Sequence, residues 1–343
     1  MKTARNIFLI IAAALIVIGL IIAFAGLFLL DFKADRLEAT VLEETTSLIT
    51  ELFTGIAIQT SDYDVKLLPS EDGSCSLVTQ EARRVRHSIG VEDGILSITI
   101  QDQRDFRDRI GIFLQSPSLT LYLPESSYDT LLVKTTSGDI SIHENLTFVD
   151  AALSASSGDL NMEAKVKNRL EGKTSSGDMA FSGALSKSLT LSATSGDIHL
   201  SDLSAESLFV QTTSGRQQLE RCQGDLVELE TTSGGIHMQN CSFTTLQTGN
   251  TSGGIHLNDC LGLTSMDLKT TSGSVLINGC DAPGIRIKTT SGSVHGQLLT
   301  PKHFTVRTNS GTVSVPDTSA ADTCRIETTS GSVRFAPSIE SSN

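Results

Sequence analysis

Apolar and polar residues alternate in short runs with a period of two along residues 131–335. Leu131 and Val133 precede a cluster of hydroxyl residues, and Ile140 and Ile142 follow it. Successive residues of a strand point to opposite faces, so such pairs are typical of strands with one buried face. The same arrangement returns throughout the segment, which predicts a short strand on each side of every hydroxyl cluster.

A Ser-Gly dipeptide lies in each hydroxyl cluster, and successive dipeptides are 19 or 20 residues apart. An interval this constant indicates a structural repeat. Glycine allows a positive φ where the chain turns, and nearby Ser and Thr hydroxyls can bond the turn backbone. The eleven predicted corners contain Gly138, Gly158, Gly177, Gly196, Gly215, Gly234, Gly253, Gly273, Gly292, Gly311 and Gly331.

One unit of this size cannot bury its apolar face, but stacked coils bury a continuous core and pair every strand with its neighbours. The predicted fold is therefore all-β: a single-stranded β-solenoid (β-helix) of about eleven 19–20-residue coils over residues 131–335. Its length would be about 50 Å at strand spacing. A sandwich of hairpins also contains short strands and turns, but it does not repeat one turn sequence at one period.

Residues 7–30 contain no charged side chain and follow a short tail, residues 1–6, that carries Lys2 and Arg5. A helix of this length extends about 36 Å, enough to cross a hydrocarbon layer of about 30 Å. We predict a retained transmembrane helix, a cytoplasmic tail and an extracytoplasmic C-terminal domain. The alternative is a signal peptide cleaved near Ala25, but the apolar run continues to Leu30.

The remaining boundaries follow from weaker patterns. Residues 31–54 are predicted to form a juxtamembrane linker, and residues 55–130 to form degenerate coils or a small β cap over the first edge of the solenoid. Pro337 cannot donate to a further ladder, so we expect the stack to stop there and residues 336–343 to form a polar tail.

Cysteines recur at the repeat interval. Cys222, Cys241, Cys260 and Cys280 each lie eight residues after a repeat serine, which predicts a ladder of stacked cysteines. Adjacent strands fall within the Cα separation of roughly 4.4–6.8 Å that disulfides need. Leu203 and Leu299 share the column and favour a buried stack of free thiols. A zinc site is disfavoured, because tetrahedral zinc needs ligands that converge from different directions and a straight column does not provide them.

Three polar columns are also predicted. The first contains His199, His237, His256 and His295; the second Asp139, Asp159, Asp178 and Asp197; the third Thr136, Thr194, Thr213, Thr232, Thr251, Thr271, Thr290 and Thr329. The histidines should point outward, and a neighbouring pair could share a metal. The aspartates should be solvated or screened by a cation such as calcium. Structural stacking of the threonines is favoured over binding of ice or a polymer.

Composition limits the function further. The chain of 343 residues has a net charge of -13 and no Trp, which argues against a nucleic-acid partner. The sequence contains no nucleophile elbow, metalloprotease helix, phosphate loop or nucleotide fingerprint. We therefore expect no catalytic residues, no metal and no cofactor.

Residues 135–142 read Thr-Thr-Ser-Gly-Asp-Ile-Ser-Ile, and residues 193–200 read Ala-Thr-Ser-Gly-Asp-Ile-His-Leu. With the apolar anchor, these units resemble the bacterial adhesin family called the toastrack domain, a family of unknown function. The resemblance covers residues 50–335 and implies a β-solenoid at the bacterial cell envelope, with relatives linked to envelope stress or adhesion. Together with the predicted single transmembrane helix, it places the chain at the bacterial plasma membrane as an expectation. Arg216, Gly235, Gly254 and Ser274 replace the aspartate of the motif, so a continuous acidic site is not implied.

The resulting hypothesis is a cell-envelope module for binding, adhesion or scaffolding that is anchored in the membrane through residues 7–30. Its partner would be a cell-wall polymer or an envelope protein. One alternative is a polysaccharide-acting β-helix enzyme, although 19-residue coils leave little chain to build a cleft of converging groups. The other is a scaffold that assembles end to end through exposed coil edges.

Overall fold

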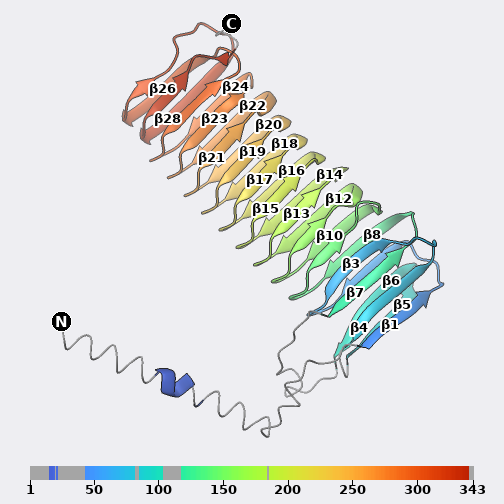
Figure 1. Ribbon diagram of the computed structural model, residues 1–343. Helices are drawn as coiled ribbons and strands as arrows, with labels where there is room; N and C mark the ends of the chain where they lie inside the picture. The colour runs from blue at the N-terminus through green and yellow to red at the C-terminus, as the bar shows by residue number, and fades with distance from the viewer. Residues whose placement is uncertain are drawn as a thin grey trace.

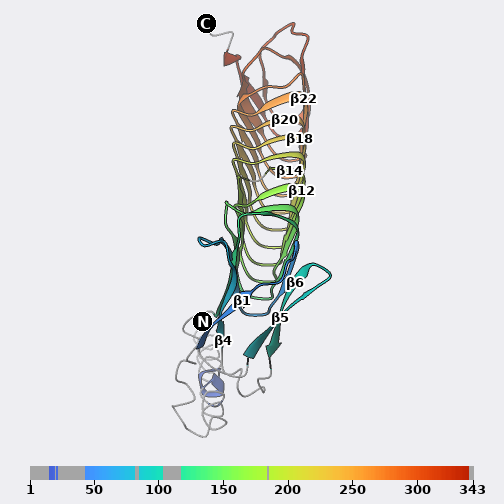
Figure 2. The same cartoon turned by 90° about the vertical axis from the view of Figure 1, so that its right-hand side faces the viewer.

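The structure is a computed structural model that describes residues 15–19, 21, 43–81, 85–102, 117–183 and 185–339. The described residues between 43 and 339 form a rod of stacked coils, with β1 near one end and β26 and β28 near the other (Figure 1). Turned by 90°, the coils stack as a ladder with their turns in line (Figure 2). The all-β solenoid is confirmed.

Two long sheets run along the rod, one of fifteen strands and one of fourteen within the described residues. The first contains β1 (Glu43–Ile49), β3 (Asp64–Pro69), β4 (Cys75–Glu81), β7 (Ser118–Leu123), β9 (Ile140–Ile142), β11 (Leu160–Met162), β13 (Met179–Ser182), β15 (Ile198–Ser201), β17 (Gln217–Glu220), β19 (Ile236–Gln239), β21 (Ile255–Asn258), β23 (Val275–Cys280), β25 (Val294–Leu298), β27 (Val313–Ser314) and β29 (Val333–Ala336). The second contains β2 (Gly55–Gln59), β5 (Val85–Glu92), β6 (Ile95–Asp102), β8 (Ser127–Lys134), β10 (Thr147–Ser154), β12 (Lys165–Thr174), β14 (Leu185–Ala193), β16 (Ser204–Thr212), β18 (Gln223–Thr231), β20 (Ser242–Asn250), β22 (Leu261–Thr270), β24 (Gly284–Lys288), β26 (His303–Ser310) and β28 (Thr323–Ser330).

Each regular coil contributes one strand to each sheet, and the Ser-Gly corner joins the two strands. Neighbouring coils are parallel and in register, so that Leu153 faces Val133 and Leu160 faces Ile140. The inward residues of both strands are almost fully buried and form one continuous core. The period-two pattern therefore produced the expected half-buried strands.

The corner glycines are required for a reason that differs from the prediction. Among the eleven, only Gly311 has a positive φ. A Cβ atom on Gly234 would lie 1.7 Å from the carbonyl oxygen of Gly215, and a Cβ on each of the other corner glycines would lie 1.7–2.2 Å from a carbonyl oxygen of a neighbouring coil. The corners thus use glycine because backbones stack directly on one another. Left-handed residues occur at the opposite turn instead, including Arg221 and Asn240.

The coil order departs from the sequence order at the N-terminal end. The coil made by β2 and β3 lies between the coil made by β6 and β7 and the coil made by β8 and β9. Strands β1, β4 and β5 pair antiparallel beyond them. Residues 55–130 therefore supply both degenerate coils and cap strands, and β1 comes from the segment predicted as linker.

The C-terminal end is interlaced in the same way. Strands β28 and β29 lie between the coil of β24 and β25 and the coil of β26 and β27. Residues 303–314 therefore form the outermost coil, although sequence order predicts that the coil ending before Pro337 is outermost. The segment between β27 and β28 is long enough for the chain to return and fill the inner position.

Most of the predicted membrane segment, residues 7–30, lies outside the described residues. Residues 15–19 and 21 are helical and exposed. Within the described part of the chain, no helix has the length and apolar character needed to cross a membrane.

Candidate binding surface

The Ser-Gly corners form one continuous edge along the rod. Backbone bonds align successive corners: Ser233 N–H donates to Thr213 O at 2.9 Å, and Ser252 N–H donates to Thr232 O at 2.9 Å. The repeat serines and the eight threonines before them are exposed. The predicted threonine column is therefore an outward row of hydroxyl groups, with a serine hydroxyl beside each one.

A second row of hydroxyl residues, which was not predicted from the sequence, holds the corner from inside. Thr231, two residues before the repeat serine, is 6% exposed, and its Oγ1 accepts the Gly234 N–H at 3.1 Å. In the same position, Thr289 Oγ1 donates to Gly273 O of the adjacent coil at 3.3 Å. Asn250 replaces threonine in one coil and makes both bonds through its amide. The sequence does contain a sign of this row, because these hydroxyl residues continue the period-two alternation of the inward apolar residues.

The aspartates form a ladder in which side chains bond to the next coil. Asp159 N–H donates to Asp139 Oδ1 at 2.8 Å, and Asp178 N–H donates to Asp159 Oδ1 at 2.7 Å. Asp64 extends this ladder by accepting from Asp139 N–H at 3.0 Å. Asp64 was not predicted, although residues 64–67 share the aspartate-apolar-x-apolar order of residues 139–142. The column therefore satisfies corner backbone groups while it exposes carboxylates.

The structure brings together two of the four predicted histidines. The ring centroids of His237 and His256 are 4.7 Å apart in an edge-to-face arrangement. Gln218 separates this pair from His199, and Leu276 separates it from His295. Burial lowers the pKa of His237, and the charges of His256 and Arg216 lower it further. The described residues contain no group of three or more side chains that could hold a metal ion.

The four predicted cysteines form the expected ladder. Leu261 N–H donates to Cys241 O at 2.9 Å, and Asp281 N–H donates to Cys260 O at 3.1 Å, which stacks one cysteine on the next. All four are free thiols with at most 3% exposure. A hydrogen bond with Cys241 and burial both raise the pKa of the Cys222 thiol. The ladder is thus part of the core.

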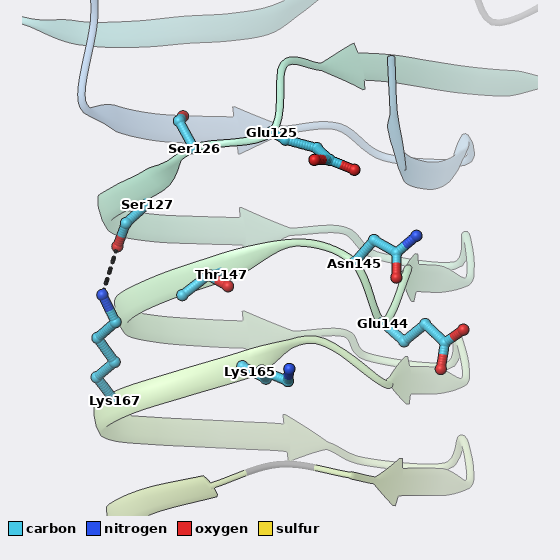
Figure 3. Close-up of a pocket in the computed structure, with 8 residues that line it drawn as sticks. All are labelled: Glu125, Ser126, Ser127, Glu144, Asn145, Thr147, Lys165 and Lys167. Carbon is cyan, nitrogen blue, oxygen red and sulfur yellow. Dashed lines mark hydrogen bonds between the residues drawn. The ribbon is translucent and has the colours of Figure 1, made fainter. Parts of the chain in front are cut away.

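An open groove of about 630 Å³ lies beside the first regular coils (Figure 3). Glu125 and Glu144 come from the turns before β8 and β10, whereas Lys165 and Lys167 come from β12. Lys167 Nζ donates to Ser127 Oγ at 3.0 Å, and Figure 3 shows this contact at the edge of the groove. The charged side chains of the lining are exposed and of both signs, which suits a solvated contact surface.

The rod, its continuous core and its polar outer edge define the chain as an all-β repeat solenoid. Its sequence matches the Toastrack DUF4097 family over residues 53–220, 163–278 and 263–337. These segments cover most of the chain, which therefore belongs to this family, as the resemblance implied. No curated protein matches the chain.

Comparison with solved structures finds similar chains at low sequence identity. The chain is similar to a putative lipid binding protein from Parabacteroides distasonis ATCC 8503, with 13% identity, 86% of this chain and 97% of that chain covered, and a TM-score of 0.40. It is also similar to a putative adhesin from Bacteroides fragilis NCTC 9343, with 13% identity, the same shares covered and a TM-score of 0.30.

Proposed function

We propose that the chain is a binding and adhesion module of the bacterial cell envelope, anchored through residues 7–30. The row of exposed threonine and serine hydroxyls would hold an extended, hydroxyl-rich cell-wall polymer. The observation that carries this proposal is the unbroken alignment of the corners, which repeats one donor and acceptor set along the rod. Membership of the Toastrack family and the apolar anchor segment are consistent with this location.

A repeated edge suits a polymer for two physical reasons. The corner backbones are fixed by hydrogen bonds between coils, so little conformational freedom is lost when a partner binds. Each hydroxyl contact is weak, but several contacts to one polymer chain raise the overall affinity, because the first contact increases the effective concentration for the next. A role as an envelope scaffold or stress component would use the same edge.

The test compares two sets of substitutions at Thr194, Thr213, Thr232 and Thr251. Replacement of all four by valine removes the hydroxyls but keeps the branched shape, whereas replacement by serine keeps the hydroxyls. Co-sedimentation with purified cell-wall polysaccharide measures binding. At roughly 0.5 kcal/mol per contact, the valine set should weaken binding about 30-fold, and the serine set should bind within about threefold of the unaltered chain.

Equal binding by the valine set would exclude this edge as the site, and absence of binding to any wall polymer would refute the proposed partner. Release of reducing ends from the polymer would favour the enzyme hypothesis instead. Labelling of intact cells with an impermeant reagent at a residue introduced near Asn343 tests the location separately.

A further inference from the structure

A lysine is completely buried where three segments meet near the C-terminal end of the rod. The Lys302 side chain is 0% exposed, and its Nζ lies 2.6 Å from Asp281 Oδ1 and 2.8 Å from Asp322 Oδ2. Asp281 follows β23, Lys302 precedes β26, and Asp322 precedes β28. One amine is therefore held between two carboxylates from different coils.

The two carboxylates differ in their surroundings. The Asp281 side chain is 22% exposed, whereas Asp322 is 46% exposed and reaches solvent. Thr300 Oγ1 lies 3.0 Å from both carboxylate oxygens of Asp281 and can donate to either. Apolar side chains of Leu298, Pro301, Phe304 and Pro316 line the adjacent small cavity, which limits the access of water to the amine.

We propose that Lys302 and Asp281 are joined by an intramolecular amide bond. Lys302 Nζ, as the neutral amine, attacks Cγ of the protonated Asp281 carboxyl, and Asp322 accepts a proton from the nitrogen. Asp322 returns this proton to the departing hydroxyl group of Asp281, which leaves as water. The N–C bond forms, the C–O bond breaks, and neither an oxidant nor another reactant is needed.

The geometry removes the usual obstacles to such a condensation. Positioned reactants behave as if one were present at an effective concentration on the order of 10⁵ M or more. Burial of the Lys302 side chain removes the water that would otherwise solvate its amine. Thr300 is placed to stabilise the developing charge on the Asp281 oxygen, as a donor does in an oxyanion hole.

A second lysine pair in the chain lacks these features and serves as an internal comparison. Lys269 Nζ lies 2.8 Å from Asp267 Oδ2, but the Lys269 side chain is 53% exposed. Water can solvate that ion pair, so its amine and carboxylate are not isolated from solvent. We therefore expect condensation at Lys302 and none at Lys269.

The amide would join the coil that ends at β23 to the beginning of the outermost coil. The bond would span the coil of β28 and β29, which lies between the coil of β24 and β25 and the coil of β26 and β27. The end of the rod would thus be fixed covalently at the point where its coil order leaves the sequence order. This inference depends on the fold and is independent of the proposed function.

Mass spectrometry of the intact full chain tests the proposal. The expected mass is 18 Da below the sequence mass, and digestion should give one peptide pair joined through Asp281 and Lys302. The mapping step is needed because cyclisation of an Asp-Gly pair also removes 18 Da. A mass equal to the sequence mass in a chain with a β-sheet circular dichroism spectrum would overturn the proposal, as would an 18 Da loss that maps elsewhere.

Variants then separate the roles of the three residues. Lys302→Met and Asp281→Ala should abolish the loss, whereas Asp281→Asn should lose 17 Da as ammonia instead. Asp322→Asn should leave a mixture that converts slowly, because the proton acceptor is absent. Lys269→Met should retain the 18 Da loss. Full conversion in Asp281→Ala would refute the assignment, and the result for the unaltered chain decides the matter if a variant fails to fold.

Discussion

Two consecutive glycines at one corner give a sharp test of backbone stacking. A Cβ on Gly234 would lie 1.7 Å from Gly215 O and 2.5 Å from Gly215 C, both of which are backbone atoms. A Cβ on Gly235 would first meet His237 Nε2 at 3.0 Å, and that imidazole lies on a half-buried side chain that can rotate. We therefore expect Gly234→Ala to destabilise the rod strongly and Gly235→Ala to be tolerated.

The magnitude follows from the separation that the new methyl group requires. An ordinary contact begins at 3.4 Å, so the two coils would have to move apart locally by more than an ångström. This would break Ser233 N–H to Thr213 O and Gln217 N–H to Gly235 O, both 2.9 Å long. Two bonds at about 1 kcal/mol each, with the packing lost around them, give about 3–5 kcal/mol for Gly234→Ala. Gly235→Ala should cost less than about 1 kcal/mol.

Urea unfolding followed by circular dichroism measures both variants, with hydrogen exchange at the corner as a local probe. The local probe matters because repeat rods can unfold in parts. Exchange should accelerate at the Ser233 and Gln217 amides in Gly234→Ala only. If both variants unfold within about 1 kcal/mol of each other, direct backbone stacking is not what selects glycine at these corners.

Further consequences concern the inner hydroxyl row, the buried thiols and the inserted coil. Thr231→Val removes the acceptor of the Gly234 N–H and should cost about 1–3 kcal/mol in urea unfolding, whereas Thr232→Val at the exposed neighbour should change stability by less than about 0.5 kcal/mol. Burial raises the pKa of the Cys324 thiol from 9.0 to about 12. Because the unfolded chain loses this proton at lower pH than the folded chain, the free energy of unfolding should fall between pH 9 and about pH 12, by on the order of 1 kcal/mol per pH unit. Cys324→Ala should flatten that slope, and an unchanged slope would contradict the assignment to Cys324. Ending the chain at Thr318 removes β28 and β29 and should abolish exchange protection in β26, which pairs with β28 within the described sheets; retained protection would show that β26 can pair with β24.

The repeat interval and the period-two pattern were sufficient to predict the core. Leu153 and Leu160 lie inward because each coil repeats the same phase, and the in-register stacking converts that phase into columns. The cysteine ladder follows from the same geometry. These features depend only on the residue pattern within one coil and on the constant interval between coils, and both can be read from the sequence.

The corner chemistry was less accessible because two hydroxyl residues precede each glycine. Thr231 and Thr232 are identical in type, but only Thr231 is in phase with the inward residues and bonds the Gly234 N–H. The role of Gly234 itself depends on contact with a different coil rather than on its own φ. Lys302 was not singled out either, because its partners Asp281 and Asp322 are 21 and 20 residues away and belong to no repeating column.

The two ends of the rod offer different edges to a further coil. In a solenoid stacked in sequence order, the last coil offers the same parallel edge as any other, and a further coil could pair with it. Here β28 and β29 occupy the position next to β24 and β25, so the outermost coil must form before or together with the chain that supports it. At the other end, β1 and β5 are edge strands of antiparallel pairs and cannot continue the parallel path. The antiparallel pairs thus end the parallel stack on the N-terminal side, whereas β26 and β27 are parallel edge strands of the described sheets on the C-terminal side, where the interlaced order fixes which coil is outermost.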